Sequence, residues 1–156
     1  MISSRDYALK LIEFRDRTEK EIRDKLLEKG YDTNETEDEI EFLKNYGYIN
    51  DLRYAKHFTA DAINIKKWGK IRIRAELLKR GIDRETIDNT IEDAFEEDDD
   101  ERVFEQMQTR FKNSDFSNMK ERTRIFNFFM RRGYTSEEIK CAINKMCSFN
   151  DIISED

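Results

Sequence analysis

Apolar residues recur along the chain at the three- and four-residue spacing of amphipathic helices. Ala55, Phe58, Ala62 and Ile65 form one such stripe, and similar stripes are found near both ends of the sequence. The chain contains no proline, so its turns must be made by Gly, Asn and Asp, and long helices are not interrupted. This pattern predicts an all-α protein.

Local signals indicate where the helices begin and end. Three capping boxes, in which a threonine is followed three residues later by glutamate, begin at Thr18, Thr36 and Thr135. Gly30 and Gly47 are expected to end helices, because glycine enters the left-handed region without strain. The expected helices cover about residues 5–17, 18–30, 36–47, 70–80, 83–95 and 100–112. A further helix of about 16–18 residues begins at position 51, and another runs through residues 125–133. The last helix begins at 135, with a frayed tail after 148.

Three glycines, Gly30, Gly81 and Gly133, recur at intervals of 51 and 52 residues. Each follows a basic residue and precedes an apolar one, and an apolar helix comes after each. Self-similarity at a fixed period is typical of tandem structural repeats. We therefore predict an elongated array of three tandem three-helix repeats, covering residues 1–49, 50–97 and 98–156, the third opening with an acidic joint.

Charge is distributed unevenly along the sequence. The segment 52–82 contains nine Lys and Arg residues against two acidic ones, in a chain whose net charge is −6. The next segment, 83–105, contains twelve acidic residues against two arginines. A local excess of positive charge is a candidate contact surface for phosphates or for an acidic protein. The acidic run 96–101 is expected to be a solvated joint, because like charges repel and no ligand geometry supports a magnesium or calcium site.

Most of the candidate binding residues lie in the basic middle repeat. They are Lys66, Lys67, Trp68, Lys70, Arg72, Arg74, Lys79 and Arg80. A second, smaller basic group consists of Arg122, Arg124, Arg131 and Arg132. These cations bind a partner in one interpretation and only solubilise the surface in the other. Trp68 could stack on a base or anchor an interface, but the favoured interpretation is that it closes the end of a helix pair.

The residue types needed for catalysis or metal binding are not grouped. His57 is the single histidine, and no Ser, Cys or carboxylate motif surrounds it. Cys141 and Cys147 lack the spacing of a metal or redox pair, which favours a reduced compartment. No apolar stretch is long enough to span a membrane, and the N-terminus does not resemble a signal peptide. We therefore expect a cytoplasmic, monomeric protein that is not an enzyme and holds neither cofactor nor metal.

The middle repeat carries the strongest resemblance to a known family. Its matching residues are Gly47-Tyr48-Ile49-Asn50-Asp51, Tyr54-Ala55, Phe58, Gly69, Ile73 and Leu77-Leu78-Lys79-Arg80-Gly81-Ile82. The first repeat adds Thr18-Glu19-Lys20-Glu21-Ile22-Arg23, Lys25-Leu26 and Lys29-Gly30-Tyr31. In this order and spacing, the sequence from residue 5 to residue 147 resembles the RecX family, the bacterial regulators of the recombinase RecA.

The resemblance implies three tandem three-helix repeats and no enzymatic activity. It also implies a partner, because similar proteins lie along the groove of the RecA–DNA filament and limit its growth, ATP hydrolysis, strand exchange and coprotease action. Our leading hypothesis is a regulator that binds RecA filaments, with phosphates of single- or double-stranded DNA as a further contact. The alternatives are a stand-alone DNA-binding protein with helix-turn-helix-like units and a helical adaptor for another acidic partner.

Overall fold

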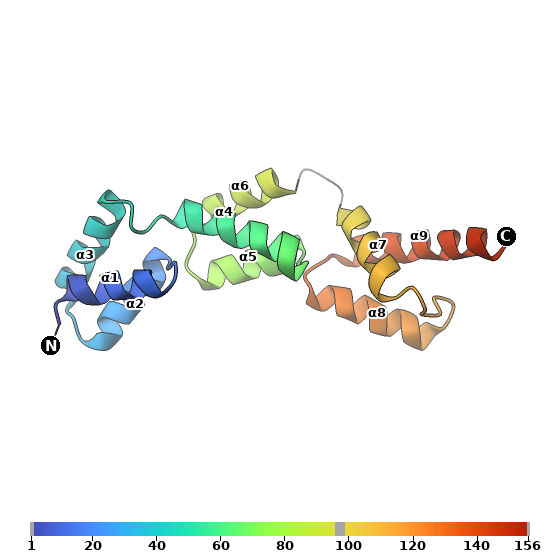
Figure 1. Ribbon diagram of the computed structural model, residues 1–156, viewed down its shortest axis with the longest axis horizontal. Coiled ribbons are helices and arrows are strands. Elements are labelled where there is room, and N and C mark those ends of the chain that lie inside the picture. Colours follow the sequence, from blue (N-terminus) through green and yellow to red (C-terminus); the bar gives the residue numbers. More distant parts are fainter. Residues whose placement is uncertain (1, 96–98, 156) are drawn as a thin grey trace. The chain divides into compact units, whose positions relative to one another are not determined.

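The computed structural model describes residues 2–95 and 99–155, and in this part of the chain all regular structure is helical (Figure 1). The prediction of an all-α protein is therefore confirmed. The elements are α1 (Ser4–Phe14), α2 (Glu19–Lys29), α3 (Thr33–Asn45), α4 (Asp51–Asp61), the π-helical turn η1 (Ala62–Lys66), α5 (Lys70–Lys79), α6 (Arg84–Ala94), α7 (Asp99–Arg110), α8 (Met119–Arg131) and α9 (Ser136–Ser154).

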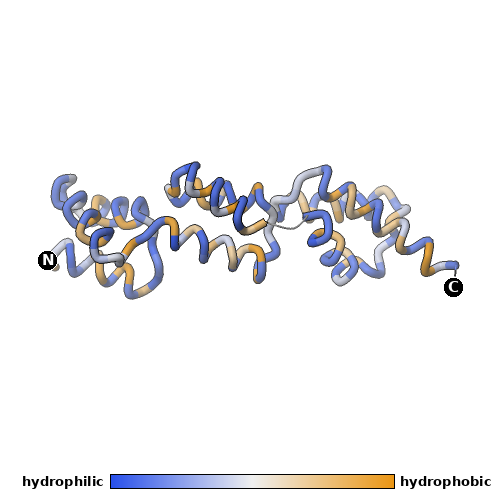
Figure 2. The backbone as a smooth tube through the Cα atoms, turned by 90° about the horizontal axis from the view of Figure 1, so that it is seen from above, coloured by the Kyte–Doolittle hydropathy of each residue, from blue (hydrophilic) through white to orange (hydrophobic). Residues whose placement is uncertain are grey.

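The helices pack into two compact units. One contains residues 1–61 and 75–90, and the other contains residues 62–74 and 91–156. Hydrophobic and hydrophilic residues alternate along the helices, as expected for amphipathic segments (Figure 2). Because the backbone passes between the units at three places, helix α5 contributes its first half to one unit and its second half to the other.

Each unit has its own apolar core. In the first unit α1, α2 and α3 pack on one another around fully buried Ala8, Leu26 and Leu43. In the second unit α7 and α8 pack against α9 around Met107 and Phe129, which are also fully buried. Burying each of the Leu, Met and Phe side chains contributes about 1.5–3 kcal/mol.

At two of the three predicted capping boxes, the threonine caps the helix as expected. The hydroxyl oxygen of Thr18 accepts a hydrogen bond from the backbone N–H of Glu21 (3.2 Å), and Thr135 caps α9 in the same way. The prediction that α3 begins at Thr36 was wrong, because Asp32 caps the helix four residues earlier and Thr36 is buried inside it. Asp32 and Glu35 have the same spacing as a capping box, and aspartate is at least as good a cap as threonine.

Two predicted helix ends also require correction. Helix α1 stops at Phe14 rather than at Arg17, because the chain must become extended before Thr18 can cap α2. Helix α9 continues to Ser154 instead of fraying after Ser148. An edge-to-face contact between Phe149 and Phe104 (6.2 Å between ring centroids) packs this last stretch against α7.

The predicted acidic joint is only partly described, because residues 96–98 lie outside the described residues. Its second half, 99–101, is the first turn of α7, where acidic residues are favoured by the helix dipole. Asp99 is only 4% exposed and pairs with Arg102 at 3.2 Å, so the expectation of a solvated joint was wrong at this residue. Across the described ranges, no group of three or more His, Cys, Asp and Glu side chains could hold a metal ion.

Candidate anion-binding site

In the second unit, the turn between η1 and α5 lies directly against the C-terminal end of α8. The backbone N–H of Gly69 donates to the carbonyl oxygen of Arg132 (2.7 Å), and the N–H of Ile71 donates to that of Gly133 (3.1 Å). A Cβ atom on Gly69 would lie 2.5 Å from the carbonyl oxygen of Gly133. One on Gly133 would lie 2.5 Å from the backbone nitrogen of Arg72. Both positions therefore require glycine. We call this contact, between residues 67–72 and 131–134, the second junction.

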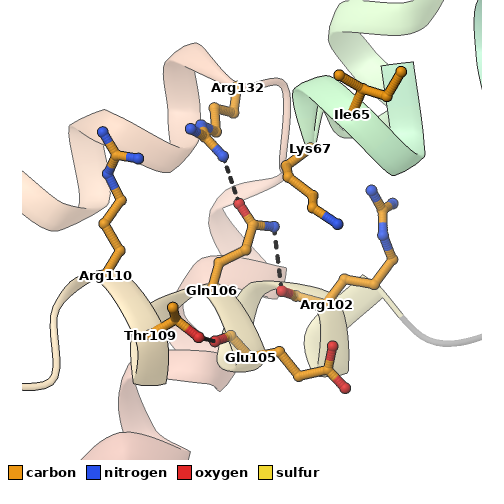
Figure 3. A pocket seen from close by; sticks show the side chains of 8 residues that line it. All are labelled: Ile65, Lys67, Arg102, Glu105, Gln106, Thr109, Arg110 and Arg132. Atoms are coloured by element: carbon orange, nitrogen blue, oxygen red, sulfur yellow. Dashed lines mark hydrogen bonds between the residues drawn. The ribbon is translucent and has the colours of Figure 1, made fainter. Parts of the chain in front are cut away.

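A chain of hydrogen bonds holds the second junction together. The hydroxyl group of Tyr134, a residue only 1% exposed, donates to the carbonyl oxygen of Lys67 (2.8 Å) and accepts from the side-chain amide of Gln106 (2.8 Å). The amide oxygen of Gln106 in turn accepts from the guanidinium group of Arg132 (2.7 Å; Figure 3). Burial raises the pKa of Tyr134, so the hydroxyl keeps its proton and remains a donor.

Beside this network lies an open groove of about 430 Å³, drawn in Figure 3. It is lined by Ile65, Lys67, Arg102, Glu105, Gln106, Thr109, Arg110 and Arg132. Four of these eight side chains are cationic and one is acidic. Arg102 is already engaged, because it pairs with Asp99 and donates to the carbonyl oxygen of Trp68 (3.1 Å). The remaining cations, Lys67, Arg110 and Arg132, come from three separate segments of the chain.

Two of these cations contact an aromatic ring and, in the described part of the chain, do not pair with a carboxylate. The guanidinium carbons of Arg110 and Arg132 lie 4.6 and 4.5 Å from the centre of the Phe128 ring. Partial burial, and after it the positive charge of Arg110, lowers the pKa of Arg132. Cation–π contacts hold a guanidinium in place without cancelling its charge. The groove therefore concentrates positive charge that can attract an anion.

Trp68 lies beside the groove, between η1 and α5. Its backbone N–H follows the π-helical turn and donates to the carbonyl oxygen of Ala62 (2.9 Å), the first residue of that turn. The ammonium group of Lys66 and the guanidinium group of Arg72 lie 4.5 and 4.1 Å from the centre of the Trp68 ring. The half-buried indole is therefore already in contact with two cations.

The structure distributes the predicted binding residues over both units. Lys67 and Arg132 line the groove, whereas Lys79 and Arg80 belong to the first unit. The others lie in the second unit outside the groove lining; they are Lys66, Trp68, Lys70, Arg72, Arg74, Arg122, Arg124 and Arg131. Sequence reasoning did not identify Arg102 and Arg110, although the spacing of Arg102, Gln106 and Arg110 places them on one face of α7.

The first unit contains a junction of the same design. The hydroxyl group of Thr18 donates to the carbonyl oxygen of Arg80 (2.7 Å), and a Cβ atom on Gly81 would lie 2.5 Å from the Cβ atom of Lys20. Lys20 and Gly81 are as far apart in the sequence as Arg72 and Gly133. We call this contact, between residues 18–21 and 80–81, the first junction.

In the groove beside the first junction, every cation has a carboxylate partner. It is lined by Arg15, Lys20, Glu21, Asp24, Glu76, Lys79 and Arg80. Its four cations all have acidic partners, in the pairs Arg15–Glu21, Lys20–Asp24, Lys79–Glu76 and Arg80–Glu76. Partial burial is the largest single influence on Arg80 and lowers its pKa, but the interactions with Glu76 and with the Tyr54 hydroxyl together outweigh it, so the pKa is raised.

Taken together, the helical units and the glycine contacts that recur in them define a helical-repeat protein. Family models agree with this class: the first three-helix domain of RecX matches residues 5–43, the second 50–91 and the third 96–143. The chain belongs to the RecX family, which is a family of regulatory proteins and not of enzymes. The residue limits predicted for the three repeats remain a prediction.

Individual relatives support the same assignment. Regulatory protein RecX of Clostridium beijerinckii is 33% identical over 145 residues, which cover 91% of this chain and 67% of the relative. That of Clostridium acetobutylicum is 34% identical over 149 residues, covering 92% and 69%. The crystal structure of RecX from Lactobacillus salivarius is similar with a TM-score of 0.72 and 25% identity, covering 92% of this chain and 94% of that one.

The chain spans about two thirds of the length of the curated relatives that it matches. In the part of the chain that the structure describes, the helices are all too short or too polar to cross a membrane.

Proposed function

We propose that this chain binds RecA filaments on DNA and lowers the ATP hydrolysis, strand exchange and coprotease activity of RecA. The structural observation that carries the proposal is the cationic groove at the second junction, in a chain that is otherwise acidic. A filament of RecA on DNA is a polymeric partner with phosphates along its length. Membership of a family of regulatory proteins supports a role in control rather than in chemistry.

The proposed mechanism combines shape with local charge. The groove side of the second unit lies against the filament, and binding stabilises a filament state that turns over ATP more slowly. Because the overall charge of the chain is −6, attraction has to come from the concentrated cations and not from the net charge. Attachment should therefore weaken steeply as salt is added.

The test is the DNA-dependent ATPase of RecA, titrated with this chain at several salt concentrations. Wild-type protein should lower the rate at sub-stoichiometric amounts, and the double variant Lys67→Gln/Arg110→Gln should need at least about tenfold more protein for half inhibition. Lys10→Gln/Lys140→Gln removes the same charge from two exposed positions on α1 and α9 and should inhibit like wild type. No change in rate at any ratio or salt would overturn the proposal.

Gel-shift experiments without RecA separate the proposal from stand-alone DNA binding. Weak, salt-sensitive shifts that do not depend on base sequence fit a filament regulator. Selective binding to one duplex sequence would instead make the chain a sequence-reading DNA-binding protein. If the chain bound neither DNA nor RecA, capture of a different acidic partner would favour the adaptor alternative.

A further inference from the structure

Lys67 has a backbone conformation that is unusual for its residue type. Its φ angle is 59°, and within the described ranges it is the one non-glycine residue with a positive φ. Such a conformation is strained for a residue with a side chain, and glycine would avoid most of that strain. The hydrogen bonds at this turn involve only the backbone of Lys67, since its carbonyl oxygen accepts from Tyr134. A glycine would satisfy the backbone equally well, so the lysine side chain must offset the strain in another way.

Lys67 lines the groove together with Arg110 and Arg132; in Figure 3 its side chain points toward Arg102, and Arg110 and Arg132 lie across Gln106 from it. Among the described residues none of these three cations forms an ion pair, whereas the four cations beside the first junction all do. The one acidic lining residue, Glu105, is exposed and lies on α7. The lining of this groove thus contains three cations without an ion pair to any described residue and one exposed carboxylate.

We propose that Lys67, Arg110 and Arg132 form a binding site for adjacent phosphate groups. This inference deepens the proposed function and rests on it for the biological ligand, which is the sugar–phosphate backbone of the DNA in the filament. A soluble polyphosphate or nucleotide carries the same chemistry and is the other source of such groups. Lys67 keeps its strained conformation because the bound state needs its ammonium group.

The chemistry of the groove favours phosphate over carboxylate. One guanidinium fork is enough to bind a carboxylate, whereas adjacent phosphates present several oxygens and more than one charge. Two guanidinium groups and one ammonium group around about 430 Å³ match the latter. Because Lys66 and Arg72 already contact the Trp68 ring, the indole is not an open platform for a base. Recognition would therefore involve phosphates and not base sequence.

The decisive variant is Lys67→Gly, since it removes the charge while relaxing the backbone. Its unfolding temperature should equal or exceed that of wild type, so lost binding cannot be attributed to misfolding. Affinity for a fluorescent oligothymidylate, measured by anisotropy without RecA, should fall about tenfold. The slope of log affinity against log salt should become shallower by about 0.7, the value for one lost contact with single-stranded nucleic acid.

Several controls make the outcome specific. Lys67→Arg should keep most of the affinity, Arg110→Gln should lose about as much as Lys67→Gly, and Lys140→Gln should change nothing. Tripolyphosphate should compete with the oligonucleotide, whereas oligoglutamate of similar charge should compete much less well. If tripolyphosphate bound and oligothymidylate did not, the phosphate site would stand with a soluble polyphosphate as its ligand.

Two results would overturn the inference: unchanged oligothymidylate and tripolyphosphate affinity in Lys67→Gly, or equal competition by oligoglutamate. The second result would make the groove a site for an acidic protein segment. Failure of the proposed function is recognised separately. In that case wild-type protein would bind phosphates with the predicted variant pattern but leave the RecA ATPase unaffected.

Discussion

The two junctions have the same backbone design, but their cations differ in whether carboxylates pair with them. In each, a helix start lies against a glycine that ends a helix, with Lys20 over Gly81 in one and Arg72 over Gly133 in the other. The difference arises from the contacts of the arginine that precedes each glycine. Arg80 pairs with Glu76, four residues earlier, whereas Phe128 lies four residues before Arg132. A repeat can therefore conserve its packing while a single side chain determines whether a groove attracts anions.

A second difference concerns the residue after each glycine. Ile82 fills this position at the first junction and is buried, so its side chain contributes only apolar packing there. Tyr134 fills it at the second junction and connects Gln106 with the backbone of Lys67. At the second junction, the buried side chain therefore belongs to a hydrogen-bond network that positions cations. The following predictions test this contrast, beginning with the largest expected effect.

Replacing the junction glycines should destabilise the protein in a graded way. Gly133→Ala brings a Cβ atom against the backbone of Arg72 at a positive φ of 96°, and we expect a loss of about 3 kcal/mol or more. Gly81→Ala meets only the side chain of Lys20 and should cost about 2 kcal/mol. Gly30→Ala has open space and should cost about 1 kcal/mol. Urea unfolding measures the series, and equal losses at all three positions would contradict the close-contact explanation.

Removing the tyrosine hydroxyl should affect both stability and binding. Tyr134→Phe leaves the carbonyl oxygen of Lys67 and the amide of Gln106 without their buried partner, and the expected loss of unfolding free energy is about 1–2 kcal/mol. Oligothymidylate affinity should also fall a few-fold, because Lys67 becomes less well positioned. The matched change at the first junction, Ile82→Val, should cost about 1 kcal/mol and leave the affinity as it was. Equal affinity in both variants would show that the hydroxyl does not position the lysine.

Replacing a glutamate by glutamine should change the stability of the protein in opposite directions near the two junctions. Burial, together with the charge of Asp99, raises the pKa of Glu138 above 4.5. A carboxyl group with a raised pKa holds its proton more tightly in the folded state, so its ionisation destabilises the fold as pH rises. Glu138→Gln should therefore be more stable than wild type at neutral pH, by less than about 1 kcal/mol because the group is partly solvated.

This advantage of Glu138→Gln should shrink as the pH is lowered and vanish below about 4.3, the ordinary pKa of glutamate. Thermal unfolding between acidic and neutral pH measures the trend. Glu21→Gln, at the first junction, should instead be slightly less stable at neutral pH, because it loses the ion pair with Arg15. A stabilising effect of Glu138→Gln that did not change with pH would have to come from packing.

The smallest expected effect is a gain of binding at the first junction. Glu76→Gln removes the carboxylate partner of Arg80 and Lys79, so the groove beside it gains unpaired positive charge. Oligothymidylate affinity at low salt should rise about two- to threefold, because exposed charges contribute little individually. Unchanged affinity would indicate that the geometry of the second groove, and not only its charge, is needed.

Much of the fold could be predicted from sequence, but only part of the site. Periodicity and helix caps predicted the helices, because these signals act over a few neighbouring residues. The repeats were predicted from the recurrence of glycine and its flanking residues along the whole chain. Lys67 and Arg132 were identified from local charge. Arg102 and Arg110 were missed because counting charge along the chain averages over all faces of α7, whose first turn is acidic. Likewise, the contact between Gly69 and Gly133 joins residues too far apart for any local pattern to reveal.

The path of the backbone between the two compact units limits how this protein can be dissected. A fragment that began at the third repeat would lack residues 62–74, which complete its unit and supply both Gly69 and Lys67. Ending a fragment after the first repeat would likewise remove Gly81 and Arg80, against which helix α2 begins. Each sequence repeat therefore takes its stability and its chemistry partly from the neighbouring repeat, and insertion or recombination at repeat boundaries would separate residues that work together.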